Sequence, residues 1–250
     1  MAGVISLVPS WTETLIACGV PVIGRTRYCI HPKDRVPAIP ILGGTKRLDW
    51  SKWQHLGAEL VVMDRDENSL EIAEQCPFPQ FSSHVRTLAD VSRDLETLGC
   101  RLQNDPLLEL AERWRSVTRH PPADQPLAHL PAVLRWIQPP VTPPQQLLYL
   151  IWRKPWMAAS TDSFIGSMLH HLGFGWAVVP RDELYPTVDL NQYDPETTLL
   201  LLSSEPFPFE QHLDKVAELP FPMALVDGEA YSWYGLRTLQ FLETRGSHSL

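Results

Sequence analysis

A chain of 250 residues, 44% of them hydrophobic, can bury a sizeable core, either as one large domain or as two lobes. Its formal net charge of -8 and its pI near 5.6, without any cluster of lysine or arginine, argue against nucleic acid and anionic membrane surfaces as main partners. No apolar stretch approaches the roughly 18 residues of a membrane-spanning helix. We therefore expect a protein that binds a small or medium-sized ligand.

The N-terminal sequence MAGVISLVPSW has neither the basic segment nor the cleavage site of a secretory signal. We expect a cytoplasmic protein if Met1 is the native start, and a periplasmic protein if an export signal preceded the sequence. The four cysteines show no C-x-x-C pairing and no zinc-ligand spacing, so neither a structural metal site nor a disulfide framework is indicated.

Short apolar runs alternate with helical patterns, which is typical of an α/β protein with mostly parallel sheets. In the first half we predict strands at 4–8, 22–23 and 60–63, and helices at 12–18, 50–56 and 67–76. Pro9 and Ser10 are expected to form a turn. Ser10 or Thr12 is expected to cap the first helix, which Gly19 ends.

The middle of the chain has a different pattern. Residues 87–102 and 106–117 are amphipathic at helical spacing, and a proline-rich stretch at 121–144 is expected to form rigid turns or a lobe boundary. Strands are predicted again at 147–152, 198–202 and 221–226, with a helix before residue 172. Because both halves repeat the order of strand, turn and helix, we expect two similar α/β lobes with a cleft between them.

The segments that follow the predicted strands are rich in aromatic residues. In parallel sheets, ligands bind outside the carboxyl ends of the strands. The six segments found there are PSWTE, GRTRYCIHP, DRDEN, WRKPWM, SSEPFPF and DGEAYSWYG, and five of them carry aromatic residues. Rigid apolar faces suit a planar or bulky ligand, although several could instead fill a lobe interior. We take Trp11, Trp152, Trp156 and Trp233 as ligand candidates, and expect Trp53, Trp114 and Trp136 to pack internally.

Metal binding and catalysis are less well supported by the residue pattern. Tyr28, Cys29 and His31 lie within four residues and could contact a metal or a metal chelate, but no second cluster accompanies them. The acidic residues of DRDEN could bind a cation or form a solvated loop. Serines next to carboxylates at 10, 204 and 232 lack a nearby histidine or an elbow motif, so no catalytic residue is predicted.

The motifs SLVPSWTETL, TRYCIHP, GGTK, MDRDEN, YLIWRKPWM, TDSFIGSML, LLSSEPFPF and DGEAYSWYG occur in this order along almost the whole chain. In this respect the chain resembles the helical-backbone (class III) ABC-transporter substrate-binding proteins, in particular their cobalamin-binding-like branch. The resemblance implies an N-terminal α/β lobe at 1–100, a long bridging helix and linker at 101–124, a C-terminal α/β lobe at 125–250, and a ligand in the cleft between the lobes.

The same resemblance implies a non-catalytic binding protein without an intrinsic cofactor, whose ligand is cobalamin, haem or siderophore-iron. The expected ligand-binding residues are Trp11, Tyr28, His31, Lys46, Trp152, Trp156, Glu205, Ser232, Trp233 and Tyr234, with Cys29 and His31 as candidates for contact with a metal.

The partner implied by the resemblance is an ABC permease. Relatives that dock on a permease present an acidic residue at the start of a helix on each lobe. The aligned positions here are the uncharged Ser51 and Asn191, and Asp49 and Asp189 lie beside them. The alternative is a cytoplasmic sensor or partner-binding protein on the same scaffold, without a transport role.

Overall fold

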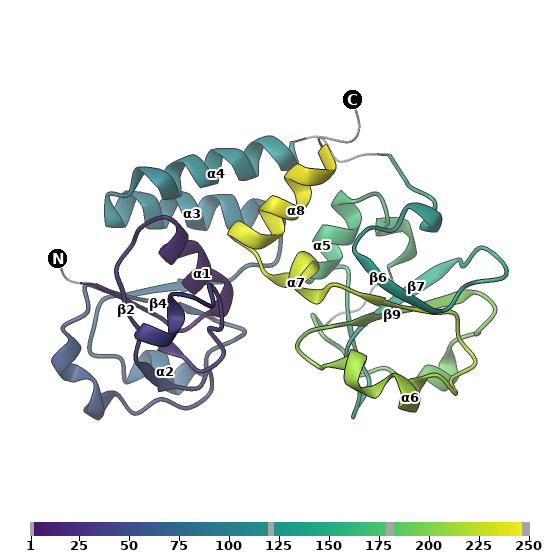
Figure 1. The fold of residues 1–250 in the computed structure, drawn as a ribbon, viewed down its shortest axis with the longest axis horizontal. Helices are drawn as coiled ribbons and strands as arrows, with labels where there is room; N and C mark the ends of the chain where they lie inside the picture. The colour runs from purple at the N-terminus through teal and green to yellow at the C-terminus, as the bar shows by residue number, and fades with distance from the viewer. Residues whose placement is uncertain (1–2, 120–122, 179–182, 247–250) are drawn as a thin grey trace. The chain divides into compact units, whose positions relative to one another are not determined.

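The computed structural model describes residues 3–119, 123–178 and 183–246 (Figure 1). Its contacts divide the chain into two units. Unit 1 comprises Met1–Val85, Ala89–Val117 and Trp233–Leu250, and unit 2 comprises Arg86–Leu88 and Thr118–Ser232. Each unit is built around a five-stranded sheet with helices, so the predicted α/β class with mostly parallel sheets is confirmed.

The sheet of unit 1 is parallel throughout, with the strand order β3-β2-β1-β4-β5. β1 and β4 are buried along their whole length, because both faces of a parallel sheet are covered and its strands are accordingly apolar. One face packs on a core that includes Leu7, Val61 and Ile72. The strands are β1 (Val4–Ser6), β2 (Val22–Thr26), β3 (Ile41–Gly43), β4 (Leu60–Asp64) and β5 (Gln80–Ser83).

The first helix, α1 (Pro9–Ala17), begins earlier than its sequence pattern suggested. Pro9 occupies the first turn, where its missing N–H is not needed and its fixed φ suits the helix. The predicted turn at Pro9 and Ser10 is therefore wrong, and no side chain caps the helix. The Thr12 hydroxyl instead donates to the Val8 carbonyl at 2.8 Å. Gly19, with φ +76°, follows the helix end as predicted.

Unit 1 also contains the longer helices α3 (Leu88–Leu102), α4 (Asp105–Thr118) and α8 (Leu236–Gly246). The first residue of α3, Leu88, and the last residue of α4, Thr118, fall in unit 2. The predictions at 87–102 and 106–117 are thus confirmed. α3 and α4 approach closely where Gly99 faces Leu108, since a Cβ at Gly99 would meet the leucine side chain at 2.6 Å. The indole of Trp114, fully buried as expected, donates to the Gly235 carbonyl at 2.7 Å and ties the C-terminal segment to α4.

The units differ from the predicted boundaries in two respects. The described part of the C-terminal segment, 233–246, packs with unit 1, although it follows the strands of unit 2 in sequence, and α4 also packs with unit 1. The role of α4 as the bridging helix stays a prediction. Residues 120–122 of the predicted linker lie outside the described residues.

The sheet of unit 2 has the order β6-β10-β9-β7-β8, in which β6 and β8 are antiparallel to their neighbours. The order β8-β7-β9-β10 matches β2-β1-β4-β5 of unit 1, which is the repeat expected from the sequence. The strands are β6 (Val133–Gln138), β7 (Gln146–Trp152), β8 (Met157–Ala159), β9 (Thr198–Ser203) and β10 (Met223–Val226), and the helices are α5 (Phe164–His171), α6 (Leu213–Val216) and α7 (Gly228–Ser232).

Three predicted elements are corrected by the structure. The proline-rich stretch contains strand β6, which forms by pairing with β10 between flanking prolines. The predicted helix at 50–56 is two 3-10 turns, Trp50–Lys52 and Gln54–Leu56, because Asp49 caps the first and Gly57, at φ +56°, ends the second. The helix predicted at 67–76 is only α2 (Leu70–Glu74), because Glu67 and Asn68 belong to the turn after β4.

Candidate functional site

The carboxyl ends of the parallel strands of unit 1 meet at one edge of the sheet. We call the surface formed there by Tyr28, His31, Lys46, Glu67, Trp233 and Tyr234 the unit 1 edge. Tyr28 and His31 follow β2, Lys46 follows β3 and Glu67 follows β4, while Trp233 and Tyr234 precede α8. Five of these six residues were predicted from the sequence. Glu67 had been considered only as part of a charged loop.

Trp233 contacts the imidazole of His31 and the guanidinium of Arg237. The imidazole of His31 meets the indole edge to face, with ring centroids 5.1 Å apart. The guanidinium of Arg237 lies 5.4 Å from the indole centroid, and Arg237 also makes two hydrogen bonds of 3.0 and 2.6 Å to Glu13 on α1. A bidentate pair to a carboxylate fixes the guanidinium plane. The orientation of Trp233 is therefore set by α1, α8 and the loop after β2.

Tyr234 links the C-terminal segment to the loop after β4. Its ring packs edge to face on Trp11 at 5.3 Å, and its hydroxyl lies near enough to Glu67 to lower the pKa of that carboxyl. Burial of Glu67, reinforced by the charge of Asp64, raises the pKa of its carboxyl to about 8, against the lowering effects of Lys46 and Tyr234. Glu67 is nevertheless partly exposed to solvent. The unit 1 edge thus includes a carboxyl group whose pKa is raised well above its usual range.

Trp11, one of the predicted ligand-binding residues, packs against Tyr234, and its role toward a ligand stays a prediction. Its side chain is fully buried, and its indole N–H donates to the Ser83 hydroxyl at 3.1 Å. Ser83 in turn donates to Asp64 at 2.7 Å, and the other oxygen of Asp64 accepts from the backbone N–H of Glu67 at 3.3 Å. Asp64 is therefore a buried residue that organises the loop, and not a solvated charge.

Cys29, predicted as a candidate for contact with a metal, lies in surroundings that do not favour that role. Its thiol is buried and accepts a hydrogen bond from Thr12 at 3.0 Å, with the Thr26 hydroxyl at 3.2 Å. Burial raises the pKa of the Cys29 thiol, against the lowering effect of those hydroxyls, so the thiolate that a metal would need is disfavoured. Across residues 3–119, 123–178 and 183–246, no group of three or more His, Cys, Asp or Glu side chains is arranged to hold a metal ion.

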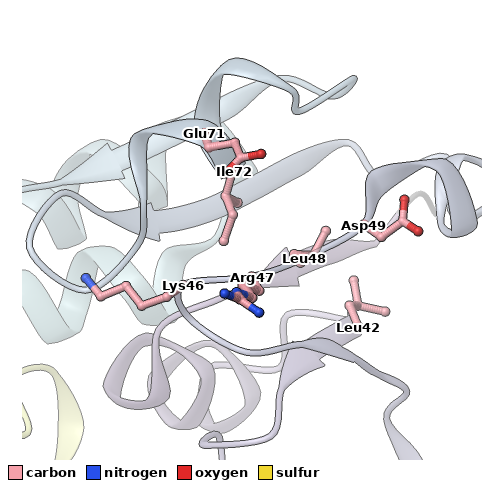
Figure 2. Close-up of a pocket in the computed structure, with 7 residues that line it drawn as sticks. All are labelled: Leu42, Lys46, Arg47, Leu48, Asp49, Glu71 and Ile72. Carbon is pink, nitrogen blue, oxygen red and sulfur yellow. The ribbon is translucent and has the colours of Figure 1, made fainter.

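Two other predicted residues of unit 1 lie at the surface. Tyr28 is 54% exposed, with the Arg27 guanidinium 5.9 Å from its ring centroid. Lys46 is exposed and donates to the Asp66 carbonyl at 3.0 Å. Lys46 also borders a pocket of about 400 Å³ whose apolar residues are Leu42, Leu48 and Ile72 and whose rim is charged. Figure 2 shows Lys46 extending away from these three apolar side chains, and its ammonium group is engaged by the Asp66 carbonyl instead.

In unit 2, a second aromatic surface follows β7 and β9. We call the set Trp152, Trp156, Phe207 and Phe209 the unit 2 edge. Trp152 meets Phe207 edge to face at 5.4 Å, Phe207 meets Phe209 at 4.7 Å, and Trp156 lies parallel to Phe209 at 6.2 Å. Trp152 is 40% exposed, whereas Phe209 is fully buried. The two predicted tryptophans, Trp152 and Trp156, therefore pack against phenylalanine side chains, and this packing restricts the orientation of their rings.

No family model and no curated relative matches the chain. Solved structures do match over almost its whole length. The periplasmic vitamin B12 binding protein BtuF of Vibrio cholerae has a TM-score of 0.71 at 16% identity, with 98% of this chain and 95% of that chain covered. S. aureus IsdE complexed with heme has 0.72 at 15%, covering 99% and 98%. The periplasmic heme-binding protein RhuT from Roseiflexus sp. RS-1 has 0.68 at 19%, covering 98% and 96%.

This chain has the fold of the periplasmic substrate-binding proteins. The resemblance to class III proteins inferred from the motifs is thereby confirmed for the fold. At these identities the match establishes architecture, and the ligand of this chain is a separate question. Among the residues that the structure describes, no helix is long and apolar enough to cross a membrane.

Within the substrate-binding-protein fold, DGEAYSWYG is mainly a short helix, and not the loop expected from its composition. Asp227 caps α7 by accepting from the N–H groups of Glu229 and Ala230 at 3.0 and 3.3 Å. Tyr231 is fully buried and donates to the Pro131 carbonyl at 2.8 Å. Ser232 donates to the Gly228 carbonyl at 2.7 Å, so its hydroxyl hydrogen is engaged within the helix.

Glu205, the remaining predicted residue, follows β9. Its backbone is held by Ser203, whose hydroxyl donates to the Glu205 carbonyl at 2.5 Å, and the residue is partly exposed. Trp136, which was expected to pack internally, is instead 36% exposed because β6 is an edge strand. Trp53 does pack against the core and donates to the Leu42 carbonyl at 3.1 Å.

Sequence reasoning missed the partners that orient the aromatic rings. Phe207 and Phe209 lie in the quoted segment SSEPFPF, and their alternation with proline was a usable signal. Arg153 lies in WRKPWM, and its guanidinium is 5.9 Å from the ring centroid of Trp156. The role of Arg237 could not be predicted from a local sequence pattern, because its partner Glu13 lies 224 residues away in the sequence.

Proposed function

We propose that this chain is a non-catalytic binding protein for a planar metal chelate, a corrinoid or a haem, and that the unit 1 edge and the unit 2 edge each offer aromatic contacts for such a ligand. The observation that carries the proposal is the pair of aromatic surfaces, one after the strands of each sheet, on a fold whose solved relatives include proteins that bind vitamin B12 and heme.

Each edge supplies a different part of the proposed binding energy. Trp152, Trp156 and Trp233 offer aromatic faces whose orientation is already fixed, so little side-chain entropy is lost on binding. Tyr28, His31, Lys46 and Glu205 offer hydrogen-bonding groups for the polar periphery of the chelate. Aromatic faces accompanied by a few polar groups are typical of small-molecule binding sites.

The test is a visible-absorbance titration of the protein with dicyanocobinamide, cyanocobalamin and haemin. We expect at least one of them to bind with one-to-one stoichiometry, and we expect the double change Trp152→Ala and Trp156→Ala to weaken binding about tenfold or more. Trp136→Ala is the matched control, since that indole is similarly exposed but lies outside the edges. Absence of binding of all three ligands to the unchanged protein would refute the proposal.

We further propose that the partner is an ABC permease that docks on Asp49 and Asp189. Each aspartate precedes a 3-10 turn, and its carboxylate accepts the N–H of the residue two positions later, Ser51 or Asn191, at 3.1 Å in both cases. Both carboxylates are exposed. The two units therefore carry the same acidic turn, in LDWSKW and VDLNQY, next to the positions where relatives carry their docking acid.

A second candidate function, that of a partner-binding protein without a transport role, is favoured by one feature of unit 2. A pocket of about 610 Å³ is lined by apolar residues, including Trp136 and Trp176, which are 36% and 43% exposed. Exposed apolar patches often mark protein interaction sites. A stable partner recovered with the unchanged protein and lost with the double change Trp136→Ala and Trp176→Ala would support this function, and recovery of no partner would count against it.

A further inference from the structure

The pocket of about 400 Å³ in unit 1 lies between two walls that are tied to each other (Figure 2). One wall is the segment 46–49 after β3, and the other is α2. The Ser69 hydroxyl, just before α2, donates to the Lys46 carbonyl at 3.3 Å. Beyond the other end of the segment, the Trp50 indole donates to the Ile72 carbonyl at 2.8 Å. Because both ends are tied, the space between the walls is part of the fold and does not have to be opened by a ligand.

The pocket combines an apolar lining with a small volume. Its apolar side chains are those of Leu42, Leu48 and Ile72, of which Leu42 and Ile72 are almost fully buried. Pockets that bind small molecules have volumes of about 300–1,000 Å³, so this pocket lies near the lower end of that range. A small ligand with an apolar part therefore fits it, because contact with these three side chains removes that part from water.

The rim of the pocket carries opposite charges that do not neutralise each other. Arg47 is exposed, and its guanidinium has no hydrogen-bond or ion-pair partner among the residues that the structure describes. Glu71 accepts from Gln75 at 3.2 Å through one of its oxygens, and it forms no ion pair with Arg47. Asp49 is already engaged, since it accepts the Ser51 hydroxyl at 2.6 Å. The groups open to a ligand are thus one guanidinium and one carboxylate.

We propose that this pocket binds a free α-amino acid with an apolar side chain. The ligand carboxylate pairs with Arg47, because a guanidinium can donate two parallel hydrogen bonds to a carboxylate. The ligand ammonium pairs with Glu71, and the ligand side chain packs on the apolar lining. Lys46 does not compete for the carboxylate, since its ammonium donates to the Asp66 carbonyl at 3.0 Å. This inference goes beyond the proposed function and does not depend on it.

The test is an NMR titration of the ¹⁵N-labelled full chain with L-phenylalanine. We expect saturable shifts of the backbone amides at 46–49 and 71–72, with a Kd of about 0.1–1 mM. Three further compounds each lack one part of the ligand: 3-phenylpropionate lacks the ammonium, 2-phenylethylamine lacks the carboxylate, and glycine lacks the apolar side chain. Each should bind about threefold to fivefold more weakly than phenylalanine, or more weakly still.

Two variants test the charged groups separately. Arg47→Gln and Glu71→Gln alter exposed side chains, so the fold should be retained, and each should weaken phenylalanine binding about threefold to fivefold. Arg65→Gln and Glu74→Gln are the matched controls, because both residues are exposed in the same unit and neither lines the pocket. The inference would be overturned by the absence of saturable shifts, by an equal affinity for any of the three incomplete compounds, or by equal losses in the control variants.

Discussion

Gly235 joins the aromatic pair Trp233 and Tyr234 to α8, and alanine is expected to be poorly tolerated there. Its φ is +98°, a conformation that costs residues with a Cβ about 1–2 kcal/mol. A Cβ at this position would also collide with the hydroxyl of Thr14. That hydroxyl accepts the Leu236 N–H at 3.0 Å and donates to the Ser10 carbonyl at 2.8 Å. Losing one of these buried hydrogen bonds adds about 1–2 kcal/mol.

We therefore expect Gly235→Ala to lower the free energy of unfolding of unit 1 by about 2–4 kcal/mol. Gly19→Ala is the matched control, because Gly19 also has a positive φ, of +76°, in the same unit, but has open space where its Cβ would stand. In the Gly19→Ala variant the free energy of unfolding should fall only by the conformational cost of a positive φ, about 1–2 kcal/mol.

Urea unfolding followed by tryptophan fluorescence measures both changes in the same unit, so the comparison does not require the two units to unfold together. Cobinamide affinity should fall in Gly235→Ala alone, because the displaced segment carries Trp233 and Tyr234. Equal losses of stability in the two variants would refute the steric reasoning, since the conformational cost is shared and only the contact with Thr14 differs.

Three further predictions follow from individual side chains. Burial raises the pKa of Asp94 to about 6, so the free energy of unfolding falls as the pH rises through about 4 to 6. In urea unfolding, Asp94→Asn should raise that free energy by about 1–3 kcal/mol at pH 7 and leave it unchanged at pH 3.5. An equal effect at both pH values would contradict this reasoning. In the native protein, iodoacetamide should alkylate the exposed Cys100 and leave the buried Cys29 thiol unmodified, which peptide mass spectrometry would measure. Similar alkylation rates for the two cysteines would contradict the burial of Cys29. The double change Asp49→Asn and Asp189→Asn should abolish the salt-sensitive docking of the protein to a permease in vesicles, and it should not alter cobinamide affinity. Unaltered docking would contradict the proposal that these two aspartates contact the permease.

The elements that could be predicted from the sequence are those with a strong local period. The apolar runs of β4 and β9 predict buried strands, and the amphipathic pattern of α3 predicts a helix. β5 was missed because it is four residues long with two serines and a glutamine, and β6 because prolines flank it. Both strands form by pairing with neighbours that are distant in sequence, β4 and β10, and a local pattern does not contain that information.

The placement of His31 and Trp152 at the ends of strands could be predicted from the sequence, because the carboxyl ends of parallel strands share an edge. Their part in ligand binding stays a prediction. Trp11 looked the same in sequence, with polar neighbours, yet it is buried. Its indole N–H is satisfied by Ser83, 72 positions away, and only the register of β5 beside β4 brings that hydroxyl within reach.

That buried network also gives a physical reason for the form of the unit 1 edge. Asp64 is placed at the end of β4, where one of its oxygens accepts from Ser83 of β5 and the other accepts from the backbone of the next loop. Its negative charge stays buried, and that charge is one of the causes that raise the pKa of Glu67. The same carboxylate therefore fixes the loop and shifts the pKa of the group at its tip. An arrangement in which one buried charge determines both geometry and chemistry favours a preorganised site, because neither property has to be created when the ligand binds.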